Sequence, residues 1–122
     1  MTRRMPSNPL LMSNNCLEIY LYLKEHVRQW IHTRFITDPR PHGLGIDHDT
    51  ERYSDLRHKH GMTIESDRNE HIRLVKEPKL TRGQIKYIWD EALFRGYMSL
   101  ASRCEAKLKE DEFINQVSKE LI

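Results

Sequence analysis

The sequence predicts a mainly α-helical fold with a minor β component. Apolar residues recur at helical spacing along most of the chain, residues 62–76 instead alternate apolar with polar side chains, and glycine, proline and capping residues separate these segments. At 122 residues, the chain is long enough for one domain with a core and short for two. We therefore expect a single domain over 14–122, with a long N-terminal helix, a small β-hairpin and a C-terminal helical hairpin that resembles a helix-turn-helix.

Residues 1–13 are predicted to form a flexible basic arm, because they hold two prolines and two arginines but few apolar anchors. A long helix is expected to follow, from about residue 15 to 35. Asn15 and Glu18 are spaced as in a capping box, the next apolar residues recur at helical spacing, and Asp38–Pro39 ends the pattern. This helix is apolar around much of its circumference, which predicts a central position or a face shared with another chain.

Residues 39–49 are predicted to be a loop by their proline and glycine content. A short helix should follow, with Thr50 as its N-cap and with Tyr53 and Leu56 on one face. Gly61 stands where a left-handed residue would end that helix.

Residues 62–76 are predicted to form a β-hairpin, because two alternating segments flank a polar turn. The competing interpretation is a helix capped by Asp67, with Glu70 three residues later. The alternation favours the hairpin.

Residues 81–110 are predicted to form two helices around Gly96. On one straight helix, the apolar residues from Ile85 to Ala92 would point in one direction and those from Leu93 to Leu108 in another, roughly 110° away. Thr81 and Gln84 have the spacing of a capping box for the first helix, and Ser99 can cap a second helix to about residue 109. Asp111 is expected to cap a last amphipathic helix.

Charge and cysteine content limit the classes of function. The chain has 20 basic and 18 acidic residues and a net charge of +2, so nucleic-acid binding would need a local basic patch. Its two cysteines lie on apolar helical stripes, which is typical of reduced thiols in an intracellular, cytoplasmic protein. No apolar run approaches the roughly 20 residues that cross a bilayer, so no membrane association is expected.

A histidine-rich segment between residues 39 and 61 contains side chains suited to metal binding or acid–base chemistry. His58 and His60 are two residues apart and would point roughly 200° from each other on a helix, so they are not arranged to chelate. We expect no metal and no cofactor, and a metal-dependent nuclease or phosphoesterase remains an alternative function. Its catalytic residues would be His48, His58, His60, Asp47 and Asp49.

A second alternative is a direct DNA- or RNA-binding regulator that uses the helical hairpin at 81–110. One face of such a unit can lie in a major groove while cations contact phosphates. The residues expected to contact nucleic acid are Arg3, Arg4, Arg82, Lys86, Arg103 and Lys107.

The first helix favours a third class, non-catalytic protein binding, because aromatic residues are enriched at interface hot spots. The residues expected at such an interface are Tyr22, Trp30 and Phe35. We therefore expect a small accessory or regulatory protein without enzymatic activity, which binds a nucleic-acid-processing protein or its nucleic-acid complex. A second copy of the chain is an alternative partner for the first helix.

Overall fold

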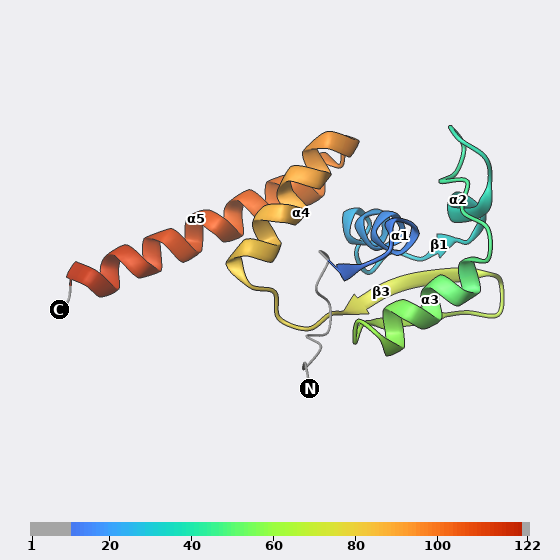
Figure 1. Ribbon diagram of the computed structural model, residues 1–122, viewed down its shortest axis with the longest axis horizontal. Helices are drawn as coiled ribbons and strands as arrows, with labels where there is room; N and C mark the ends of the chain where they lie inside the picture. The colour runs from blue at the N-terminus through green and yellow to red at the C-terminus, as the bar shows by residue number, and fades with distance from the viewer. Residues whose placement is uncertain (1–10, 121–122) are drawn as a thin grey trace.

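The computed structural model describes residues 11–120, with side chains from 11 to 110, so most of the predicted arm, including Arg3 and Arg4, lies outside the described residues. The described part is mainly α-helical with a small antiparallel sheet (Figure 1), which confirms the predicted fold class. In chain order the elements are α1 (Asn14–Glu25), β1 (Ile31–His32), α2 (Arg34–Thr37), α3 (Asp49–His58), β2 (Thr63–Ser66), β3 (His71–Lys76), α4 (Arg82–Arg95) and α5 (Met98–Glu120).

The first helix is shorter than predicted, since α1 ends at Glu25 instead of running to about residue 35. The chain turns through Arg28, whose φ is 66°, and β1 then pairs with β3. The Arg28 N–H donates to the Leu74 carbonyl at 3.0 Å, and the Thr33 N–H donates to the Glu70 carbonyl at 2.8 Å. These bonds satisfy the outer edge of β3, which explains why this segment leaves the helix although its apolar spacing would allow it to continue.

Strands β2 and β3 pair antiparallel within the range predicted for the hairpin, with Ile64 opposite Leu74. Asp67 lies in the turn between the strands, so the alternative of a helix capped by this residue is wrong. Strand β1 joins the free edge of β3, which gives the sheet the order β1-β3-β2. One face of the sheet is buried through Ile64, Ile72 and Leu74.

Helix α3 begins at Asp49, one residue before the predicted cap, so Thr50 lies inside the helix. The N-cap position is His48, which is in the left-handed region at φ 56° and makes no capping bond with its side chain. Tyr53 and Leu56 are buried on one face as expected. After the helix, Gly61 has a φ of 68°, the left-handed conformation predicted from its place in the sequence.

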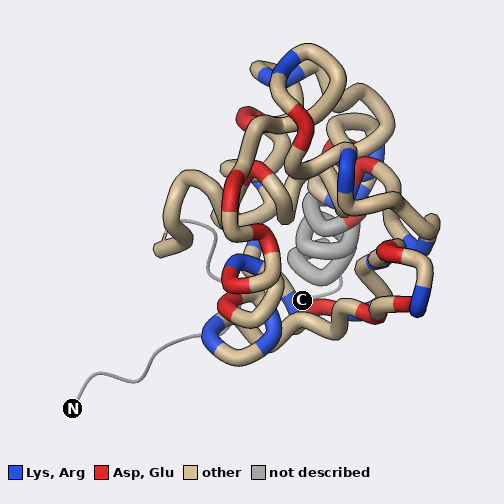
Figure 2. Tube along the Cα trace, turned by 90° about the vertical axis from the view of Figure 1, so that its right-hand side faces the viewer, with Lys and Arg blue, Asp and Glu red and all other residues tan. Residues whose placement is uncertain are grey.

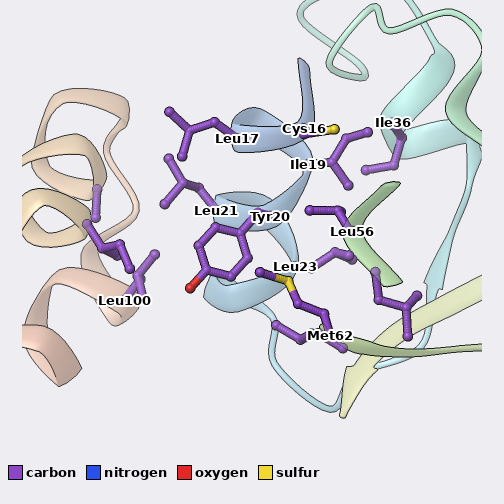
Figure 3. Close-up of a cluster of buried hydrophobic side chains, with 14 of the residues drawn as sticks. Cys16, Leu17, Ile19, Tyr20, Leu21, Leu23, Ile36, Leu56, Met62 and Leu100 are labelled. Carbon is purple, nitrogen blue, oxygen red and sulfur yellow. The ribbon is translucent and has the colours of Figure 1, made fainter. Parts of the chain in front are cut away.

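Helix α1 lies at the centre of the core, one of the two positions expected from its apolar circumference. In Figure 3, Leu17 and Leu21 point toward the α4–α5 side, where Leu100 approaches, whereas Ile19 points toward Ile36 of α2. All five side chains are buried. The single helix therefore joins the two halves of the core.

Helices α4 and α5 form the helical hairpin expected around Gly96, which ends α4 with a φ of 78°. The predicted capping box is present, because Thr81 and Gln84 each accept a hydrogen bond from the other's backbone N–H. Helix α5 runs without interruption from Met98 to Glu120, so the predicted new helix at Asp111 is wrong. No glycine or proline follows Gly96, so this stretch contains neither of the two strongest helix breakers.

The C-terminus of α1 meets the N-terminal part of α5, and a side chain of each helix bonds backbone groups of the other. The Leu100 N–H donates to the Glu25 carboxylate at 2.7 Å, and the Arg103 guanidinium donates to the Lys24 carbonyl at 2.6 Å and the Glu25 carbonyl at 3.2 Å. An anion at a helix N-terminus and a cation at a C-terminus both complement the helix dipole. These contacts fix the α4–α5 hairpin on the rest of the fold.

Candidate functional site

Helix α3 packs one face inward and presents the other to solvent. It contacts α1 and β2, and its exposed side chains lie on the side away from its buried residues. The exposed face of α3 consists of Thr50, Glu51, Ser54 and His58. These are hydrogen-bonding side chains of the kind that can approach a base edge or a peptide.

Arg57 connects α3 to the neighbouring strand. Its Nε donates to the Ile64 carbonyl at 3.0 Å, and its Nη2 donates to the Ser66 hydroxyl at 3.0 Å. The two bonds set the position of α3 against β2, so we assign Arg57 a structural role.

The β2–β3 turn, residues 67–70, is exposed and ordered by its first residue. One carboxylate oxygen of Asp67 accepts hydrogen bonds from the N–H groups of Asn69 and His71, each at 2.8 Å. Local desolvation opposes ionisation, but these bonds and the nearby His71 ring outweigh it and lower the pKa of Asp67. Arg68 stands exposed in the same turn.

The order of this turn should depend on pH. Because the folded-state pKa of Asp67 lies below its unfolded value, ionisation of the carboxylate favours the folded turn, and this contribution is lost as pH falls through the lowered pKa. Following the Asn69 and His71 amide resonances by NMR should give a midpoint below the ordinary aspartate pKa of about 3.9. Asp67→Asn, which keeps an acceptor oxygen, should lack this transition. A midpoint at or above the ordinary value would contradict the role of Asp67.

The histidine-rich segment is spread over the loop and helix α3. Asp47 and His48 are exposed before the helix, Asp49 is its first residue, His58 is its last, and His60 follows it. Among residues 11–110, no three histidine, cysteine, aspartate or glutamate side chains are grouped so that they could hold a metal ion.

Three of the basic residues predicted to contact nucleic acid lie together, away from α3 and the β2–β3 turn in the sequence. Arg82, Arg103 and Lys107 line one cavity, and two lysines that sequence reasoning missed, Lys24 and Lys79, line it as well. We call it the cationic cavity. Only the fold could reveal it, because its cations come from α1, from the segment before α4, and from α4 and α5.

Lys86 lies beside the cationic cavity rather than in it. It lines a neighbouring pocket with Arg82 and Trp89, its Nζ is 4.8 Å from the Trp89 ring centroid, and it is 3.7 Å from the Asp90 carboxylate. Arg103, by contrast, bonds the α1 carbonyls, so part of its guanidinium is committed to the fold.

The aromatic residues predicted to bind a partner differ in their exposure. Tyr22 packs against Tyr97, with ring centroids 6.3 Å apart, and is half-buried. Trp30 is 43% exposed and has the Arg73 guanidinium 4.4 Å from its ring centroid, and Phe35 is 39% exposed.

A more exposed apolar group, missed by sequence reasoning, surrounds the α4–α5 turn. Phe94 is 86% exposed, Met98 58% and Leu93 43%. The helical pattern places Leu93 with the core residues, and only the packing of the hairpin shows that this end of α4 is uncovered.

Charges of both signs interleave on the side of the molecule that carries the β2–β3 turn (Figure 2). On α3, Arg52 and Arg57 are accompanied by Asp49, Glu51 and Asp55. This side therefore produces no strong cationic field, and any nucleic-acid binding here would depend on a few specific contacts.

Over residues 11–120, none of the helices combines the length and the apolar character that crossing a bilayer requires. Comparison with protein-family models, curated proteins and solved structures finds no match to this chain.

Proposed function

We propose that the protein binds duplex DNA through the exposed face of α3 and the β2–β3 turn. The observation that carries the proposal is the order of elements: a helix, a short strand, two helices and a hairpin, with the strands arranged as β1-β3-β2. This order resembles that of a winged helix-turn-helix, and by analogy with that fold the last helix before the hairpin would enter the major groove, with the hairpin turn beside it. The unit that we propose for DNA binding spans 14–76, whereas the sequence pattern pointed to 81–110.

One part of the unit departs from that arrangement. Helix α2 is a single turn, and residues 38–48 connect it to α3, whereas a DNA-binding helix-turn-helix has a turn of three or four residues. The proposal therefore rests on α3, the hairpin and the strand order rather than on the turn between α2 and α3.

The chemistry of the two exposed elements suits a groove. Ser54 and Thr50 can donate to or accept from base edges, Glu51 can accept from a cytosine amino group, and Arg68 can contact a phosphate or guanine. Arg57 and Asp67 hold these elements in fixed positions through the bonds described above. Preorganised contacts of this kind lose little conformational entropy on binding.

Fluorescence anisotropy with labelled duplexes of varied sequence tests the proposal. Arg68→Ala should weaken binding to every duplex and reduce the slope of log affinity against log salt by about 1. Ser54→Ala should instead cost about 1–3 kcal/mol on preferred sequences and relax the preference. The control Lys109→Ala, on α5, should leave both properties unchanged.

Two results would contradict this assignment. One is the absence of duplex binding by the wild-type chain at low salt. The other is binding that survives the α3 and turn substitutions but is lost in Lys86→Ala, which would move the interface to the α4–α5 hairpin.

Protein binding is the second candidate function, favoured by the exposure of Phe94, Met98 and Leu93 at the α4–α5 turn. Adjacent apolar side chains at this exposure are typical of an interaction surface. A nucleic-acid-processing protein is the partner that we propose for it, because the same helical hairpin carries the basic residues Arg82, Arg103 and Lys107. Affinity purification from the native source should lose that partner in Phe94→Ser and keep it in the control Lys59→Ser, and an unchanged partner set would contradict this role.

A further inference from the structure

The cationic cavity has a volume of about 630 Å³, within the range of roughly 300–1,000 Å³ that small-molecule sites occupy. It lies between the C-terminal turn of α1, residues 77–81, the start of α4 and the first half of α5. Arg103, which lines the cavity, also donates to the α1 carbonyls. The cavity is thus built from segments far apart in the sequence and held by the fold itself.

Its charge is strongly one-sided. Among the residues whose side chains the structure describes, Glu77 is the one acidic residue that lines it, and that carboxylate accepts from the Lys24 ammonium at 2.6 Å and from the Tyr20 hydroxyl at 2.8 Å. Within residues 11–110, all other charged residues that line the cavity are lysines or arginines. Burial raises the pKa of the Cys104 thiol at its floor, so this group stays neutral near pH 7 and offsets none of the positive charge.

Two further features favour an anion. The Arg103 guanidinium has five N–H donors, and its bonds to the α1 carbonyls use only part of them. The N-terminus of α4 also opens here, with Thr81 lining the cavity as its N-cap, so the positive end of the helix dipole adds to the side-chain charges.

The cavity also has an apolar floor. Pro78, Leu80, Ile85 and Leu100 line it, and the last two are buried. An inorganic anion would leave this surface in contact with water, whereas a ligand with an apolar or aromatic body would cover it. A carboxylate would bring a single negative charge to a site with several cations. A di- or triphosphate would bring several negative charges and so matches the site better.

We propose that the cationic cavity is a binding site for a nucleoside di- or triphosphate. Its phosphates lie against the lysines and arginines at the start of α4 and on α5, and its base covers the apolar floor. This site is distinct from the DNA-binding surface proposed above and does not depend on it.

Isothermal titration of the 122-residue chain with ADP tests the site, with adenosine and pyrophosphate as partial ligands. ADP should bind, pyrophosphate should bind more weakly, and adenosine should not bind at millimolar concentration. The double variant Lys79→Gln/Lys107→Gln should lower the ADP affinity at least tenfold, since both side chains line the cavity. The matched control Lys109→Gln, on the same helix but outside the cavity, should change it less than twofold.

Circular dichroism shows whether each variant is folded, so a loss of binding can be read as a loss of contacts. Equal binding of ADP and adenosine, no binding of ADP, or the same loss in the control and in the double variant would each overturn the proposal. If ADP fails to bind but the double variant loses duplex affinity, these lysines are DNA-phosphate contacts and the cavity is not a ligand site. Duplex binding that depends on α3 but not on these lysines would show that the DNA-binding surface and the cationic cavity are separate sites.

Discussion

Replacing Leu56 by alanine is expected to lower the free energy of unfolding by about 2–5 kcal/mol. Leu56 is fully buried on α3 and points toward α1 in the core (Figure 3). The substitution removes three carbons from a packed environment and leaves a cavity, because α1 is held from its other side by the α4–α5 hairpin. Such a loss is a large fraction of the stability of a small domain. Urea denaturation followed by circular dichroism measures it.

The matched control is Ser54→Ala, two residues earlier on the exposed face of the same helix. It should change the free energy of unfolding by less than about 0.5 kcal/mol. Equal effects of the two substitutions would show that α3 is not anchored through Leu56. Because α3 is also the proposed DNA-binding helix, Leu56→Ala should weaken duplex binding through loss of the folded state, whereas Ser54→Ala should weaken it without loss of stability.

Local signals predicted several parts of this fold correctly. Thr81 and Gln84 form their capping box, and Gly61 and Gly96 take left-handed conformations, because each of these features depends on residues close in sequence. The alternation over 62–76 located β2 and β3 for a similar reason. Successive side chains of a strand point to opposite faces, so a sheet with one buried face alternates apolar with polar residues along the sequence.

The end of the first helix could not be predicted in this way. The apolar residues from Val27 to Ile31 fit a continuing helix, and the competing structure depends on β3, some forty residues further along the chain. Pairing with β1 satisfies the backbone N–H and C=O groups on the outer edge of β3. These groups would lack that partner if the first helix continued. Tertiary hydrogen bonding overrode local propensity here.

The same limitation applies to the unit that we propose for DNA binding. The hairpin at 81–110 has strong caps and a glycine turn, so it is conspicuous in the sequence. Helix α2 has four residues and no capping bond from a side chain. Its relation to α3 and to the β2–β3 hairpin follows only from the strand order. Arg82, Arg103 and Lys107, which the sequence suggested as nucleic-acid contacts, line the cationic cavity, and Lys24 reaches it only because α1 packs against α5.

The connection between α2 and α3 depends on a glycine that has no room for a side chain. A Cβ at Gly43 would lie 2.5 Å from the Asp38 carbonyl oxygen and 2.9 Å from the Arg34 carbonyl oxygen. Both are backbone atoms of the α2 region, which cannot turn aside as a flexible side chain can. Gly43→Ala should therefore force the loop away from α2 and destabilise the protein by about 1–3 kcal/mol.

Gly45→Ala separates this steric effect from backbone strain. Gly45 has a φ of 69°, but a Cβ there would meet no atom closer than 3.9 Å, so its substitution should cost only about 1 kcal/mol from the left-handed conformation. Urea denaturation compares the two variants. Amide hydrogen exchange should show Gly43→Ala opening the bonds from Leu44 to Phe35 and from Ile46 to Ile36, which hold the loop on α2. If Gly43→Ala proves no more destabilising than Gly45→Ala, close contact with α2 does not fix the loop. The start of α3 would then have to be positioned by its packing on α1 alone.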